Sequence, residues 1–228
     1  MSRQPLRIAF AGASGTGKTT LAKYVYEVMA PDMKFNPIGS RSVSKMMGFN
    51  SPYDVDMASL LVYNQTLNRT RDANKAARKS MEGCTLGDTT MRAKFQQVLM
   101  LEKVAWEENH PFMVTDRTTL DVAAYIAMHC PNELHTGILD VAVKHMALYD
   151  IIFYCPMEPF IRLDDGVRVT TLGYHKAYDF FIHGGLKKCT DGESHTELIA
   201  LQTPDLDKRK EIVHKTVTRW VEWLKSKN

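Results

Sequence analysis

A glycine-rich segment between an apolar run and a helical pattern constrains this chain most strongly. Residues 12–19 have the sequence GASGTGKT, which fits the pattern G-x-x-x-x-G-K-[ST]. The apolar run Leu6–Ala11 before it predicts a buried strand, and Leu21, Val25 and Val28 after it fall on one side of a helix. Glycines let such a loop turn its N–H groups inward around an anion, and the following helix presents its positive end to the same anion. The segment therefore predicts a strand, a phosphate-binding loop and a helix.

The residue types at the end of this loop indicate a nucleotide with a metal ion. Lys18 is expected to reach the β- and γ-phosphates of ATP, and the Thr19 hydroxyl is expected to be a ligand of Mg²⁺. A flexible glycine turn would not account for a lysine and a hydroxyl directly after the last glycine. The residues expected to bind the phosphates are Gly12, Ala13, Ser14, Gly15, Thr16, Gly17, Lys18, Thr19 and Thr20.

Short apolar runs alternate with helical patterns along the rest of the chain. This alternation predicts a three-layer α/β fold, with a parallel sheet of about five strands flanked by helices. Because the runs are short and mostly apolar, we expect strands that are buried on both faces. The expected strands are Leu6–Ala11, a weak one near Phe35–Ile38, Phe112–Thr115, Asp150–Tyr154 and Glu197–Gln202.

Two long helices with apolar stripes are expected, and Asp205 is expected to cap the second. Aromatic residues on these stripes are interpreted as core rather than ligand contacts. The stripes consist of Phe95, Leu99 and Trp106 in a helix from about Thr89 to Asn109, and of Val213, Val217, Trp220 and Leu224 in the last helix.

Composition favours one domain over residues 1–228, with 44% hydrophobic and 24% charged residues. No apolar run is long enough to span a bilayer and no signal peptide is recognised, so we expect a cytoplasmic protein that is neither secreted nor membrane-spanning. The four cysteines form no C-x-x-C pair, which favours reduced thiols over a zinc site. A net charge of +3 permits a polyanionic partner without requiring one.

A second motif follows one of the expected strands. Asp116 ends the strand, at the edge of an open α/β sheet where ligands bind. Its carboxylate can face the phosphate loop, where it would organise Mg²⁺ or orient and deprotonate a hydroxyl. The adjacent Arg117 can hold an anionic or hydroxylated acceptor. A surface salt bridge is the alternative interpretation of this pair.

The run VTDRTTLDVAAY, residues 114–125, resembles two kinase families. It is similar to the D-R-Y-x-x-S-x-x-A-Y pattern of thymidylate kinases, and more similar to the D-R-[ST]-x-x-D-x-x-A-Y run of AAA-type P-loop kinases related to nicotinamide riboside kinase. Both resemblances imply the P-loop kinase fold, with Asp116 as the catalytic or metal-organising carboxylate. Asp116, Arg117, Ala124 and Tyr125 match both patterns, whereas Thr118 and Asp121 match only the second.

A third run resembles the strand and lid of the same AAA-type kinases. It consists of the apolar segment 150–156 and the later sequence DDGVR, residues 164–168. The resemblance implies a helical lid over about 157–190, with Arg168 as the arginine that closes on the phosphates and Arg162 as a weaker candidate. A closing cation would stabilise charge on the transferred phosphoryl group.

The acceptor is expected to bind in a helical region over about 39–110. The part from about 39 to 87 aligns with neither family, and Arg41 is a candidate acceptor contact. Residues 69–79 carry five basic side chains and one acid, a local balance of 5 − 1 = +4. Arg71, Lys75, Arg78 and Lys79 would share one helix face, and Arg78 and Lys79 are candidate contacts to a polyphosphate backbone. A solvated helix face is the alternative.

The sequence thus predicts an ATP-dependent kinase that phosphorylates a hydroxyl of a nucleoside-type acceptor. Lys18, Asp116, Arg117 and Arg168 are the predicted catalytic residues, with Thr19 and Asp116 at the metal. Three acceptors remain open: a free nucleotide such as dTMP, a nicotinamide-type riboside, or 5-hydroxymethyluracil already in DNA. The last follows from the resemblance of viral DNA-base kinases to thymidylate kinases, and would place the protein in a host cytoplasm. The alternative of another class is a nucleotide-regulated binding protein that transfers no phosphate.

Overall fold

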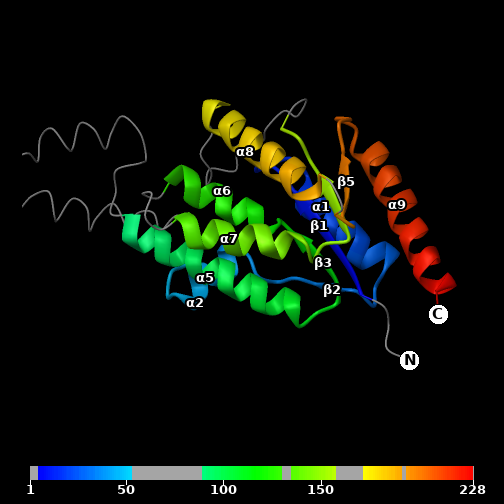
Figure 1. Cartoon of the computed structure of the whole chain (residues 1–228), viewed down its shortest axis with the longest axis horizontal. Helices are drawn as coiled ribbons and strands as arrows, with labels where there is room; N and C mark the ends of the chain where they lie inside the picture. Colours follow the sequence, from blue (N-terminus) through cyan, green and yellow to red (C-terminus); the bar gives the residue numbers. More distant parts are fainter. Residues whose placement is uncertain (1–4, 53–88, 130–134, 158–171, 192–193, 228) are drawn as a thin grey trace, which may run out of the picture.

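Five parallel strands form one sheet at the centre of the structure. The computed structural model describes residues 5–52, 89–129, 135–157, 172–191 and 194–227. The strands have the order β2-β3-β1-β4-β5 across the sheet, and every neighbouring pair is parallel (Figure 1). Their bounds are β1 Leu6–Ala11, β2 Lys34–Phe35, β3 Phe112–Asp116, β4 Ile151–Tyr154 and β5 Glu197–Ala200.

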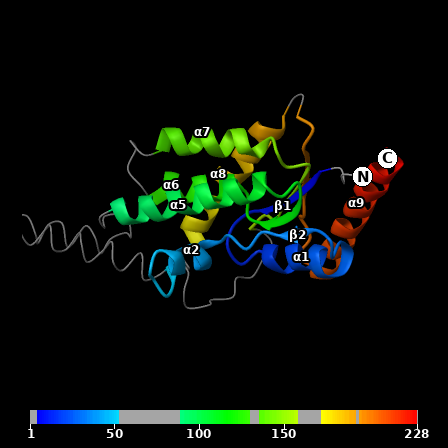
Figure 2. The same ribbon diagram turned by 90° about the horizontal axis from the view of Figure 1, so that it is seen from below.

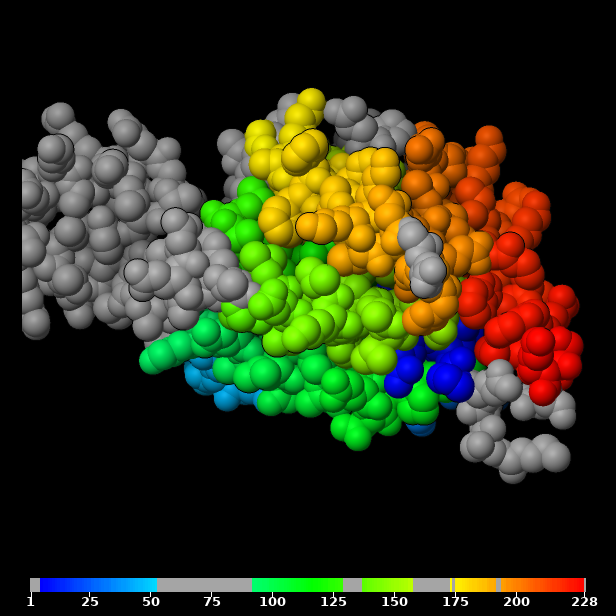
Figure 3. Space-filling model, in the orientation of Figure 1, coloured from blue at the N-terminus to red at the C-terminus, as the bar shows by residue number. Residues whose placement is uncertain are grey.

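Helices cover both faces of this sheet, so the prediction of a three-layer α/β fold with five parallel strands is confirmed. On one side lie α1 Lys18–Tyr24, the π-helical turn η1 Val25–Met29 and α9 Leu206–Ser226. On the other side lie α5 Thr89–Glu108, α6 Thr119–His129, α7 His135–Met146 and α8 Leu172–Thr190 (Figure 2). The short helix α2 Ser40–Met46 packs against α5. In the space-filling view, α5, α7 and α8 form a continuous layer over the sheet (Figure 3).

Strand β1 shows why both faces are buried. Its side chains alternate between the two layers, as the period of a strand requires. Leu6, Ile8 and Phe10 pack with α1 and α9, whereas Ala9 and Ala11 pack with α6 and α8. All five are fully buried. The apolar run seen in the sequence is therefore the centre of two hydrophobic layers rather than the face of one.

Both edge strands differ from the prediction. The strand expected at Phe35–Ile38 is β2, Lys34–Phe35, and the ladder ends when the Asn36 N–H donates to the Val114 carbonyl. Pro37 has no N–H to continue it. β5 ends at Ala200 instead of Gln202, and its residues are only partly buried because it lies at the edge of the sheet. Burial on both faces is therefore wrong for β5, and also for β2, whose Lys34 is exposed and whose Phe35 is partly buried.

β1 has the predicted bounds, β3 and β4 each differ from the prediction by one residue, and one helix position differs in burial. β3 extends through Asp116 and β4 begins at Ile151. Val28 was expected on the buried stripe after the glycine loop, but it is 64% exposed. The helix changes at Val25 to a π-helical turn, closed by the Ala30 N–H on the Val25 carbonyl, and this wider turn rotates Val28 outward.

The strand order also fixes where a ligand can bind. β1 and β3 are neighbours, yet the helices that follow them, α1 and α6, lie on opposite faces of the sheet. The carboxyl ends of these two strands are therefore a topological switch point of the sheet. Open α/β sheets have a crevice at such a point, and it is their usual binding position. The glycine loop follows β1 and Asp116 ends β3, so both predicted motifs lie at this crevice.

Candidate active site

The glycine loop between β1 and α1 has a backbone that only glycine accommodates well. Gly12, Gly15 and Gly17 have φ of +133°, +81° and +84°, in the left-handed region. A Cβ at Gly12 would lie 2.2 Å from the Cys155 carbonyl oxygen, so β4 approaches too closely for any side chain. Gly17 is the N-cap of α1. The loop thus ends at the positive end of a helix, as a phosphate-binding loop requires.

Lys18 is folded into this loop. Its side chain is buried, and Nζ donates to the Ala13 carbonyl and, over 3.4 Å, to Thr16 Oγ1. Burial, and then the charge of Arg117, lower the pKa of Lys18 to about 8, although nearby aspartates act in the opposite direction. Among the described residues, the hydrogen bonds of this buried ammonium go to neutral oxygens, so an anion at this loop would be attracted to it.

The Thr19 hydroxyl and the Asp116 carboxylate meet in the crevice. Thr19 Oγ1 donates to Asp116 Oδ2, joining α1 to the end of β3 across 97 residues of sequence. Asp116 Oδ1 is buried and accepts no hydrogen bond from the described residues. A hydroxyl and a carboxylate with one free oxygen fit the few protein ligands that Mg²⁺ takes when phosphates and water complete its shell. Elsewhere in the described part of the chain, no group of three or more His, Cys, Asp or Glu side chains could hold a metal ion.

Asp121 holds the glycine loop in place from the other side. Its Oδ1 accepts from the Gly12 N–H at 3.2 Å, and its Oδ2 accepts from both the main-chain N–H and the hydroxyl of Thr118. The Asp121 side chain is fully buried, and its main-chain carbonyl accepts from the Tyr178 hydroxyl of α8. In the sequence alone, Asp121 stands out only as a match to one family pattern. Its role as an anchor of the loop depends on contacts across 109 residues.

Arg117 has an unusual backbone and bridges several parts of the site. It is the only non-glycine residue with positive φ in the described ranges, at 83°. Its guanidinium donates to Ser14 Oγ in the glycine loop at 3.0 Å and to the Tyr178 hydroxyl at 3.1 Å, and lies 3.8 Å from the Asp121 carboxylate. A left-handed arginine costs about 1 kcal/mol, so the surrounding contacts must hold it there.

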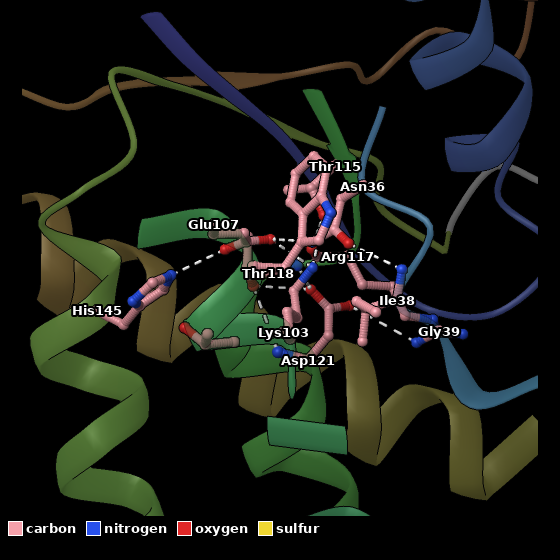
Figure 4. A network of polar contacts seen from close by, with 12 residues as sticks. Asn36, Ile38, Gly39, Lys103, Glu107, Thr115, Arg117, Thr118, Asp121 and His145 are labelled. Carbon is pink, nitrogen blue, oxygen red and sulfur yellow. Dashed lines mark hydrogen bonds and ion pairs between the residues drawn. The ribbon is translucent and has the colours of Figure 1, made fainter. Parts of the chain in front are cut away.

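A buried polar network supports the strand end behind Arg117 (Figure 4). Lys103 and Glu107, one turn apart on α5, form an ion pair of 2.7 Å, and both side chains are almost fully buried. Lys103 Nζ also donates to the Thr115 hydroxyl, which donates in turn to the Arg117 carbonyl at 3.3 Å. The network therefore reaches the residue next to Asp116.

Glu107 also contacts three other side chains. Asn36 Nδ2 donates to Glu107 Oε1 at 2.8 Å, and Tyr149 Oη donates to Oε2 at 2.7 Å. His145 Nε2 lies 2.8 Å from Oε2. The carboxylate thus joins α5 to α7, to the turn before β4 and to the segment after β2. These contacts satisfy a charge that would otherwise be expensive to bury.

The structure brings together only part of the predicted site. Gly12 to Thr20, Asp116 and Arg117 converge at the crevice. Arg41 lies on α2 with an exposed side chain. The segment 157–190 expected to form a lid includes α8, whose Tyr178, Ile182 and Leu186 are buried in the core. The predicted residues outside the described ranges are Arg71, Lys75, Arg78, Lys79, Arg162 and Arg168.

Comparisons with known proteins find likenesses among solved structures. No family model matches the chain, and no curated protein matches it. Among solved structures, the thymidylate kinase of Candida albicans is similar over 96% of this chain and 93% of that chain, with 12% sequence identity and a TM-score of 0.45. A TM-score this low carries no argument about the present chain. None of the helices that the structure describes is long and apolar enough to cross a membrane.

Proposed function

We propose that this protein is an ATP-dependent kinase that transfers the γ-phosphate to a hydroxyl of a nucleoside-type acceptor. The observation that carries the proposal is the contact between Thr19 and Asp116, beside the buried Lys18. A hydroxyl, a carboxylate and an ammonium converge where a glycine loop meets a helix N-terminus, which is the set of groups that binds a nucleotide triphosphate with its metal.

The residues at the crevice would have two different roles, phosphate binding and acceptor binding. The N–H groups of the loop and the ammonium of Lys18 would bind the phosphates of ATP, and Arg117 would hold the acceptor or the transferred group from the other side. In the transfer, the acceptor oxygen bonds to the γ-phosphorus while the bond to the β–γ bridging oxygen breaks. ADP leaves with that electron pair, and the hydroxyl proton passes to water.

Thr19 and Asp116 are the residues that would hold magnesium. The sequence left Asp116 with two roles, at the metal or as a base for the acceptor hydroxyl. Its contact with Thr19 favours the metal-organising role, because Thr19 is itself the expected ligand. When bound, Mg²⁺ supplies charge neutralisation of the phosphates. The hydrogen bonds of Asp121, and those that link Lys103, Thr115 and Arg117, would hold the glycine loop and the end of β3 in place around the metal.

The acceptor is proposed to be nucleoside-like, on the resemblance of residues 114–125 to thymidylate kinases and nicotinamide riboside kinases. A free nucleotide, a nicotinamide-type riboside and 5-hydroxymethyluracil in DNA remain the three candidates. The DNA acceptor depends on the basic residues of segment 69–79. Phosphate contacts there would make binding fall steeply with salt, with a log–log slope of about −0.9 per neutralised phosphate of duplex.

Labelled phosphate incorporation tests the proposal. The protein is incubated with Mg²⁺, γ-labelled ATP and, separately, dTMP, nicotinamide riboside and DNA containing 5-hydroxymethyluracil, at two salt concentrations. Transfer to DNA that is weakened by the double reversal Arg78→Glu and Lys79→Glu would identify the polymer acceptor. Transfer to a free small molecule at a rate that the double reversal does not change would instead identify the basic segment as a solvated surface. Binding of ATP with no transfer to any acceptor would instead favour the nucleotide-regulated binding protein.

A further inference from the structure

Arg209 bridges two loops that are far apart in sequence. It lies in the first turn of α9 and is fully buried. Its guanidinium donates to three main-chain carbonyls. Nη1 donates to Thr16 in the glycine loop at 2.8 Å, Nε donates to Thr203 at 2.7 Å, and Nη2 donates to Leu201. Leu201 and Thr203 belong to the connection between β5 and α9, so one side chain fastens this connection to the glycine loop.

The start of α9 is capped and lies near the glycine loop. Asp205 caps the helix, accepting from the N–H groups of Asp207 and Lys208 at 2.9 and 3.2 Å. A methyl group added at Gly17 would lie 4.0 Å from Leu206 Cδ1, so the first residue of α9 lies near the loop. Asp205 therefore stabilises the first turn of α9, whereas the Arg209 guanidinium is held by its own hydrogen bonds to the three carbonyls.

The contact with Thr16 also orients the next N–H group of the loop. In a trans peptide the carbonyl and the following N–H point in opposite directions. Because the Thr16 carbonyl is directed at Arg209, the Gly17 N–H is directed away from α9. A charged donor also polarises the peptide that it binds, which strengthens the opposite N–H as a donor to an anion.

We propose that Arg209 is a positioning residue that holds the Thr16–Gly17 peptide ready for a phosphate before the nucleotide arrives. This inference rests on the proposed nucleotide site. The arginine touches no substrate, and it acts through the main chain of the glycine loop. Its effect therefore falls on the phosphate end of the ligand, whatever occupies the nucleoside end.

Two ligands separate this role from a general effect on stability. Binding of MgATP and of inorganic tripolyphosphate with Mg²⁺ is measured by calorimetry for the wild type, Arg209→Met, Arg209→Lys, Asp205→Ala and Lys18→Met. We expect Arg209→Met to weaken both ligands by the same factor, about tenfold to a hundredfold for a lost charged hydrogen bond to the loop. Arg209→Lys keeps the charge and should restore part of the affinity.

Asp205→Ala is the matched control. It loosens the same turn of α9 without removing a contact of the Arg209 guanidinium, so the melting temperature should fall while both affinities stay within about twofold. Native tripolyphosphate affinity in Arg209→Met would overturn the inference, and so would an equal loss in Asp205→Ala. If Lys18→Met weakens binding while Arg209→Met does not, only this inference fails. If the wild type binds neither ligand, the proposed function fails and the inference with it.

Hydrogen exchange in the ligand-free protein covers the case in which Arg209→Met does not fold. With Arg209→Lys, the peptide that covers residues 12–21 should exchange faster than in the wild type, whereas the strand β1 before it should not. Unchanged exchange together with native affinity for both ligands in Arg209→Lys would contradict the proposed role.

Discussion

Replacing Glu107 by glutamine measures what the buried network contributes to stability. The substitution keeps the shape of the side chain but removes the carboxylate that lies 2.7 Å from the Lys103 ammonium. Lys103 is 2% exposed and would remain in the core without its opposite charge. Removing one partner of a buried ion pair typically costs about 3–5 kcal/mol, because the other charge is left uncompensated.

The pKa of Glu107 gives a second estimate of the same contribution. Burial alone would raise this pKa, but the Lys103 charge and the hydrogen bonds from His145, Lys103 and Tyr149 lower it from 4.5 to about 2. The difference corresponds to about 3 kcal/mol of folding free energy. Because the folded pKa is the lower one, this contribution is complete above pH 4.5 and is lost as the pH falls towards 2.

Urea unfolding at pH 7, 4.5 and 3 of the wild type, Glu107→Gln and Glu108→Gln tests this reasoning. Glu108 is the exposed neighbour on the same helix, so its substitution should change the free energy of unfolding by less than about 0.5 kcal/mol. Glu107→Gln should lose about 3–5 kcal/mol at pH 7 and should lose less than the wild type on acidification. Equal stabilities of the two variants at pH 7, or parallel acid losses in wild type and Glu107→Gln, would refute it.

Three further substitutions test particular contacts. In thermal melts, Gly12→Ala should destabilise the fold by about 2–4 kcal/mol, because the added Cβ would clash with the Cys155 carbonyl and Gly12 has a positive φ. The control Gly137→Ala in α7 adds its Cβ in open space and should be neutral or stabilising. Asp116→Asn should abolish phosphate transfer and remove the strengthening of ATP binding by Mg²⁺; an unchanged Mg²⁺ effect would assign Asp116 to the acceptor side alone. Asp205→Ala should lower the free energy of unfolding by about 1 kcal/mol in urea titrations through loss of the helix cap, and a wild-type value would mean that the two capping hydrogen bonds contribute nothing.

The features that the sequence predicts best are those encoded in local runs. The glycine loop, the strand before it and the Asp116 strand are contiguous patterns, and their periods and residue types are sufficient to identify them. Edge strands are predicted less well, because their limits depend on neighbours. β2 ends where Asn36 and Pro37 leave the ladder, and β5 is only partly buried because no strand in the described ranges lies beyond it.

The buried charged residues Arg209, Lys103 and Glu107 belong to no recognised motif, but their spacing along the helices indicates that they are buried. Arg209 stands four residues before Val213, on the buried stripe of α9. Lys103 and Glu107 likewise continue the four-residue spacing of Phe95 and Leu99 on α5. A charged residue in register with an apolar stripe must find a buried partner. Which partner it finds depends on the packing of segments far apart in sequence, and that requires the fold.

Phosphate transfer by Lys18→Ala, measured beside the wild type, tests whether the glycine loop binds the phosphates of ATP. ATP labelled on the γ-phosphate is supplied with Mg²⁺ and the acceptor panel, and circular dichroism verifies that both proteins are folded. The wild type is expected to move label to a nucleoside-type acceptor. The variant is expected to lose this transfer while keeping its fold, because Lys18, folded into the glycine loop, is proposed to bind the phosphates. Transfer by the folded variant within about threefold of the wild-type rate would contradict the assignment of this loop as the phosphate site.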